Sequence, residues 1–112
     1  MRIAVSSSGL ALTEAVKVEV RRRLLLAMSR FGHEVKGVTV RLAATDNPLG
    51  GIDQRCHVRA RLRSGRDLSA EAVNGGLTTV VSRSASRLAR LVAAELDGGN
   101  GRPLLIPRGA EE

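Results

Sequence analysis

The sequence predicts a two-layer α/β sandwich, ordered β-α-β-β-β-α, in which a four-stranded mixed sheet carries both helices on one face. Three patterns indicate this fold. Polar and apolar residues alternate in four short segments, and two longer segments repeat apolar residues every three to four positions. The apolar residues of the strands also fall on one side only. We therefore expect both helices to cover that side and the opposite face of the sheet to be left to water.

The first strand is expected over 2–6 and the first helix over 14–31, with Thr13 as its N-cap and Gly32 as its end. The inward stripe of this helix is Val16, Val20, Leu24, Ala27 and Phe31. Val18, Leu25 and Leu26 point away from that stripe and should be exposed. The second strand, 36–44, should lie parallel to the first because a helix crosses over between them.

Two further strands are expected within 54–72, joined by the three-residue loop 64–66. Cys56 points inward in this alternation. Pairing Leu62 with Leu68 and Ala60 with Ala70 keeps the apolar residues of both strands on one face. The same register places two pairs of opposite charge across the strands, Arg63 opposite Asp67 and Arg59 opposite Glu71.

The last helix is expected from a cap at Asn74 to about Leu96, with its apolar stripe facing the core. That stripe is Leu77, Val81, Ala85, Leu88 and Val92. Residues 1–97 then form one domain, and 98–112, which are rich in Gly near their start, are expected to form a flexible tail.

Charge is the first indication of function. The chain of 112 residues has 18 Lys and Arg against 11 Asp and Glu, a net charge of +7, and 16 of the 18 basic residues are Arg. Such an excess favours a polyanionic partner, and the guanidinium group suits phosphate oxygens. An ordinary solvated surface, or an Arg content raised by a GC-rich genome, is the alternative explanation. With one Phe and no Trp or Tyr, stacking on bases is largely excluded, so RNA would be bound through phosphate and shape.

Three groups of residues are candidates for RNA binding. The first is a stripe on the last helix, opposite its apolar side and without an acid three or four positions later. The second is the outward pair of the first helix, and the third is the part of the sheet face that lacks an acid directly opposite. In that order the candidates are Arg83, Arg87 and Arg90; Arg22 and Arg23; and Arg55, His57 and Arg61.

The sequence offers little for catalysis. His33 follows a helix, His57 lies on an open sheet and Cys56 faces the core, so no nucleophile, base and orienting group converge. We expect no enzyme activity, no cofactor, no metal site and no small-molecule substrate. A single Cys indicates neither a disulfide framework nor a zinc cluster and fits a reducing cytoplasm. No segment has the features of a signal peptide or a membrane span.

Several stretches together resemble the hibernation-promoting factor and ribosome-associated inhibitor family of ribosomal subunit-interface proteins, also called the sigma-54 modulation protein family. They are Leu-Thr-Glu-Ala-Val at 12–16, Ser-Arg-Phe at 29–31, Val-Thr-Val-Arg-Leu at 38–42 and Gly-Gly-Ile-Asp-Gln-Arg-Cys at 50–56 with the strand that follows. The chain departs from the family at the start of the last helix, where Gly76 to Ser82 lack the aromatic and the two acids of many members.

The resemblance implies the β-α-β-β-β-α domain and a short form without the long-form dimerisation domain. It also implies binding to ribosomal RNA of the small subunit near the decoding region, where such proteins silence idle ribosomes during a stress response. A protein-interaction module is the alternative, in which Val18, Leu25 and Leu26 form a homodimer or partner surface and the charge has no RNA role.

Overall fold

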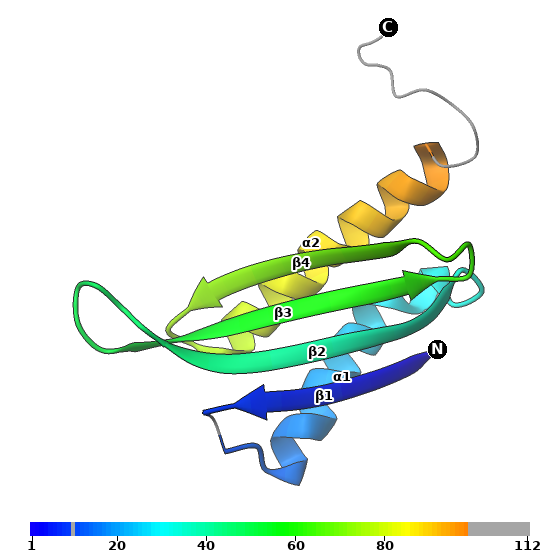
Figure 1. Ribbon diagram of the computed structural model, residues 1–112. Helices are drawn as coiled ribbons and strands as arrows, with labels where there is room; N and C mark the ends of the chain where they lie inside the picture. The colour runs from blue at the N-terminus through cyan, green and yellow to red at the C-terminus, as the bar shows by residue number, and fades with distance from the viewer. Residues whose placement is uncertain (10, 99–112) are drawn as a thin grey trace, which may run out of the picture.

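The computed structural model of the protein describes residues 1–9 and 11–98, which adopt the predicted order of elements (Figure 1). The elements are β1 (Arg2–Ser8), α1 (Glu14–Met28), the short 3-10 helix η1 (Ser29–Phe31), β2 (Val35–Asp46), β3 (Ile52–Leu62), β4 (Asp67–Asn74) and α2 (Leu77–Gly98). Apart from Gly98, the tail expected over 98–112 lies outside the described residues, so that expectation stays a prediction.

The four strands form one sheet in the order β1-β2-β3-β4. β1 runs parallel to β2, with Ile3 beside Val38, and the two following pairs are antiparallel. Figure 1 shows the sheet from its open face, with α1 and α2 behind it. The predicted mixed sheet with both helices on one face is therefore confirmed.

Thr13 caps α1 as expected, because its hydroxyl oxygen accepts a hydrogen bond from the Val16 N–H at 3.2 Å. The helix then tightens into η1 and stops at Gly32. Val18, Leu25 and Leu26 are 56%, 50% and 63% exposed, as the helical pattern predicts. The outer face of α1 is consequently apolar at three positions.

The core lies between the sheet and the two helices. Its fully buried members include Leu24, Met28, Val40, Leu42, Val58, Leu62, Val80 and Leu88. Cys56 is fully buried, as the strand alternation predicts, and accepts a hydrogen bond from the Ser84 hydroxyl at 3.0 Å. Burial raises the pKa of the Cys56 thiol. Cys56 therefore belongs to the packing of the core.

The register predicted for the β3–β4 hairpin is wrong by two residues. Leu68 lies opposite Ala60, and Ala70 lies opposite Val58. A shift by two keeps every side chain on its predicted face, so the alternation alone cannot detect it.

The turn decides the register. The Leu62 N–H donates to the Arg66 carbonyl at 2.8 Å, and the Gly65 N–H donates to the Leu62 carbonyl at 2.9 Å. The loop is thus 63–65, and its third position needs a positive φ, which Gly65 supplies at +96°. The predicted loop, 64–66, would have placed Arg66 there.

The prediction that Asn74 is the N-cap of α2 is also wrong. Asn74 pairs with Gln54 as the last residue of β4, and the helix begins at Leu77. The Asn74 side chain accepts a hydrogen bond from the Gly76 N–H at 2.9 Å, so it supports the turn that leads into the helix. The inward stripe is confirmed from Val81 to Val92, and Leu77 is half-buried.

Candidate nucleic-acid interface

The outer side of α2 carries three exposed arginines, Arg83, Arg87 and Arg90. Together with Ser82 and Ser86 they line a shallow depression of about 260 Å³. Within residues 1–9 and 11–98, Arg83 and Arg90 have no acid or other hydrogen-bond partner. The predicted stripe is therefore one continuous cationic surface, which we call the α2 surface.

Arg87 differs from its two neighbours because its guanidinium donates to the backbone carbonyl of Glu71 on β4. A second hollow of about 420 Å³ lies between Arg87, Arg90 and Leu91 of α2 and residues 69–71 of β4. β4 is an edge strand of the sheet. The α2 surface thus borders the β4 edge of the sheet.

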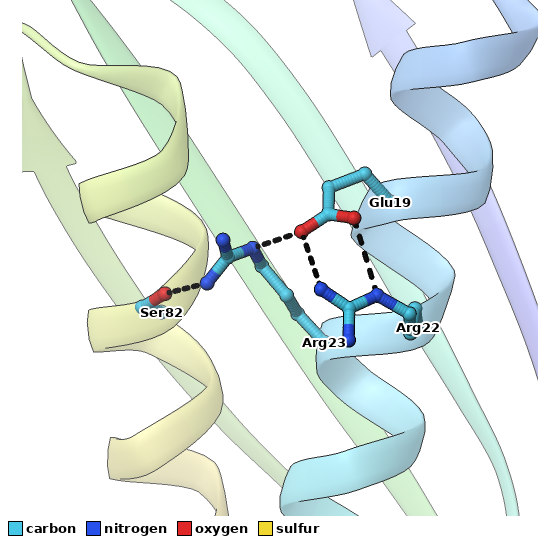
Figure 2. Close-up of polar contacts among 4 residues, drawn as sticks. All are labelled: Glu19, Arg22, Arg23 and Ser82. Carbon is cyan, nitrogen blue, oxygen red and sulfur yellow. Dashed lines mark hydrogen bonds and ion pairs between the residues drawn. The ribbon is translucent and has the colours of Figure 1, made fainter.

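Arg22 and Arg23 on α1 are held by Glu19 (Figure 2). Arg22 makes two hydrogen bonds to the Glu19 carboxylate, at 3.2 and 3.0 Å, and Arg23 Nε lies 2.8 Å from Glu19 Oε2. The hydrogen bond from Arg22 is the main cause of a lowered pKa at Glu19. Arg23 also donates to the Ser82 hydroxyl on α2 at 2.9 Å. Glu19 therefore neutralises part of the charge of this candidate pair. Arg22 is exposed as predicted, but the prediction that Arg23 points outward is wrong, because Arg23 is half-buried and connects the two helices.

The open face of the sheet carries its ion pairs in a different arrangement from the predicted one. Arg61, expected to be free, makes a bidentate contact with Asp67 at 3.1 and 3.2 Å, and Arg59 Nη2 lies 3.5 Å from the same carboxylate. Arg61 is the main cause of the lowered pKa of Asp67. The predicted pair between Arg63 and Asp67 is wrong, because the actual register places Arg61 opposite Asp67 and Arg63 donates to a backbone carbonyl instead.

The predicted pair between Arg59 and Glu71 is wrong for the same reason. Glu71 lies opposite His57, and its carboxylate is 3.7 Å from Arg55 Nε. Arg55 is half-exposed and His57 is half-buried. All three sheet candidates thus have an acidic neighbour, since Arg55 and Arg61 contact an acid and His57 lies directly opposite Glu71. The prediction that His57 and Arg61 lack an acid directly opposite is therefore wrong, and the α2 surface retains the freer arginines.

Sequence reasoning did not select Arg2 and Lys36 as site residues. Both are exposed, and both line a hollow on the open face together with Arg59 and Arg61. Each belongs to the beginning of its own strand, so their sequence positions are far apart. Only the parallel pairing of β1 with β2, which sets Arg2 beside Gly37, brings them together.

The described residues, 1–9 and 11–98, also bear on metal binding and on membrane spans. In this part of the chain, no three His, Cys, Asp or Glu side chains gather closely enough to hold a metal ion. Neither described helix combines the length and the apolar character needed to cross a lipid bilayer.

Comparison with known proteins identifies the fold. No protein-family model and no curated protein matches the sequence. Among solved structures, the chain is similar to the Thermus thermophilus Protein Y N-terminal domain, with 22% identity and a TM-score of 0.67 over 82% of this chain and 96% of that chain. It is also similar to a ribosomal subunit interface protein from Coxiella burnetii, with 15% identity and a TM-score of 0.69 over 87% of this chain and 99% of that chain. The chain therefore has the fold of these two proteins, as its resemblance in sequence to the ribosomal subunit-interface family implies.

Proposed function

We propose that this chain is a ribosome-associated factor that binds RNA of the small ribosomal subunit near the decoding region and silences translation by idle ribosomes. It acts in the cytoplasm by occupying a site, without an enzymatic step. The observation that carries the proposal is the α2 surface, where Arg83 and Arg90 have no partner within the described residues. Unpaired guanidinium groups on a folded surface are suited to phosphate.

The chemistry of the surface favours RNA recognised by its backbone. The chain has no Trp or Tyr, and its one aromatic residue, Phe31, is buried, so bases have no stacking platform. Contacts from arginines to phosphates carry no sequence information by themselves. Selectivity for one place on the ribosome then comes from shape, as is common for structured RNA.

The fold adds an argument by analogy. Both solved relatives share the arrangement of this chain, and one of them is described as a ribosomal subunit interface protein. Fold alone does not determine function, so this likeness supports the proposal only together with the arginines. The net charge of +7 points in the same direction.

A lysate of the source cells, run on a sucrose gradient, tests the proposal. At low salt the chain should migrate with small subunits or whole ribosomes, and at high salt it should return to the top of the gradient because phosphate contacts are screened. Added to a cell-free translation reaction, the purified chain should lower protein synthesis. A chain that stays at the top at every salt concentration and leaves translation unchanged would refute the proposal.

The exposed residues Val18, Leu25 and Leu26 support a second candidate, a homodimer or partner surface on α1. Burial of apolar side chains depends little on salt, so the two candidates differ in a measurable way. A salt-insensitive dimer in light scattering, with no chain on ribosomes, would favour this second function.

A further inference from the structure

The open face of the sheet has a hollow of about 430 Å³ at the end where β1 and β2 begin and β3 ends. This end lies near the N label in Figure 1. Its cationic lining is Arg2 of β1, Lys36 of β2, and Arg59 and Arg61 of β3. The volume is in the range of about 300–1,000 Å³ that is usual for small-ligand sites. The hollow is separate from the α2 surface, which lies on the helix layer.

The pairing of the strands explains why a hollow forms there. Arg2, Gly37 and Arg61 lie side by side on three neighbouring strands, and Ala4, Thr39 and Arg59 form the next row. The middle strand, β2, thus contributes the small residues Gly37 and Thr39 beside Lys36, and arginines line the hollow from β1 and β3. Adjacent strands are about 4.8 Å apart, so the backbones at the two borders are about 10 Å apart. Long cationic side chains can converge on one anion across that distance.

The charge of the hollow is not balanced. Four cationic side chains line it, and the nearest acid that contacts them is Asp67, which pairs with Arg61 and Arg59. Within the described residues, Arg2 and Lys36 have no acid partner. Asp67 lies on β4, on the side of β3 away from β2, and does not line the hollow. The Thr39 hydroxyl adds an uncharged donor at the floor. Several donors, an excess of positive charge and no aromatic platform together suit a group with several phosphates.

We propose that this hollow is a second anion site of the chain, and that it binds a run of linked phosphates. The phosphates can belong to a free oligophosphate, such as the triphosphate of a nucleotide, or to successive phosphodiesters of RNA. Either source is bound through phosphate oxygens, with the base left in water. The site goes beyond the α2 surface that carries the proposed function, because Arg83, Arg87 and Arg90 do not line the hollow. Of the residues named as candidates for RNA binding, Arg61 is the one that lines it.

A titration with sodium tripolyphosphate in about 0.1 M salt, where the Debye length is about 10 Å, tests the site. Binding is measured by calorimetry and by amide shifts in NMR spectra. In the native chain, the largest shifts should fall at residues 2–4, 36–39 and 59–61. Ala4→Glu places a carboxylate inside the hollow and should weaken binding about tenfold or more through repulsion of the phosphates. Ala4 is exposed on an edge strand, so the fold should tolerate this change.

Ser8→Glu is the matched control. Ser8 is exposed on the same strand and the same face, and four residues of strand place it about 13 Å from Ala4. It adds the same charge outside the hollow, so it should weaken tripolyphosphate binding less than about twofold because salt screens at that distance. Equal weakening by both variants, or amide shifts confined to α2, would overturn the proposal.

Two more ligands identify the source of the phosphates. If Ala4→Glu weakens the binding of a twelve-nucleotide poly-uridine RNA as much as it weakens the binding of tripolyphosphate, RNA phosphates occupy the hollow. If the variant weakens the binding of ATP and tripolyphosphate but leaves the affinity for the RNA unchanged, a free oligophosphate occupies the hollow. The double variant Arg83→Gln, Arg90→Gln should still bind tripolyphosphate at the hollow. The outcome of this test is therefore independent of the outcome of the ribosome-binding test.

Discussion

Replacing Arg83 and Arg90 by Gln removes two guanidinium groups from the α2 surface without touching the core. Both side chains are exposed, and no partner within the described residues depends on them. The free energy of unfolding should therefore change by less than about 0.5 kcal/mol. Arg87 is left in place because it also donates to the Glu71 carbonyl, so its loss would mix binding with stability.

The expected loss of binding can be calculated. Each phosphate contact contributes about 0.7 to 0.9 to the slope of log affinity against log salt, the lower value for single strands. Two contacts contribute about 1.4 to 1.8. Between 50 and 200 mM salt, a fourfold rise, the native chain should then lose about 7 to 12 times more affinity than the double variant. The variant is weaker at low salt and less sensitive to added salt.

Fluorescence anisotropy of the labelled chain with purified small subunits, repeated at several salt concentrations, measures both quantities. Arg30→Gln with Arg66→Gln is the matched control, because it removes the same charge from arginines already engaged with Phe31 and Glu95. The control should keep most of the salt slope. A double α2 variant with the affinity and slope of the native chain would refute the assignment of the α2 surface.

Three other changes test the fold, each by urea denaturation. Gly65→Ala should destabilise the chain by about 1–2 kcal/mol because φ is +96° there, whereas Ser64→Ala should cost less than about 0.5 kcal/mol. The buried Cys56 should resist alkylation in the folded chain, and Cys56→Ala should cost about 1 kcal/mol. Because folding raises the pKa of this thiol, the native chain should lose stability as pH rises above about 8.5, where the unfolded thiol ionises, and Cys56→Ala should lack that part of the loss. Ser82→Ala should cost about 1 kcal/mol by removing the bond to Arg23, and no change in the urea midpoint would show that this bond does not stabilise the helix pair.

The layers of the fold could be predicted because the spacing of apolar residues indicates which side of each helix and strand is buried. Cys56 faces the core as its strand alternation requires, and Thr13 caps the first helix as its position requires. The hairpin register could not be predicted from alternation, since a shift by two residues changes no face. Gly65 distinguishes the two registers, because the loop 63–65 places glycine at the third position, where φ is positive, and the loop 64–66 does not.

Contacts and shared faces within a single helix could be predicted from the sequence. Contacts between two elements could not. Arg83 and Arg90 share a face by helical spacing alone. Glu19 stands three and four residues before Arg22 and Arg23, so its ion pairs could have been foreseen from sequence. The bond from Arg23 to Ser82 depends on how the helices pack, which no local pattern contains.

Chemical footprinting of the ribosome tests the central claim most directly. Hydroxyl radicals cleave exposed RNA backbone, so bound protein protects the nucleotides that it covers. With saturating chain at low salt, we expect protection of small-subunit RNA around the decoding region, and we expect the double variant of Arg83 and Arg90 to lose it at the same concentration. A small subunit whose RNA is cleaved identically with and without the chain, under conditions where both are intact, would contradict the proposed function.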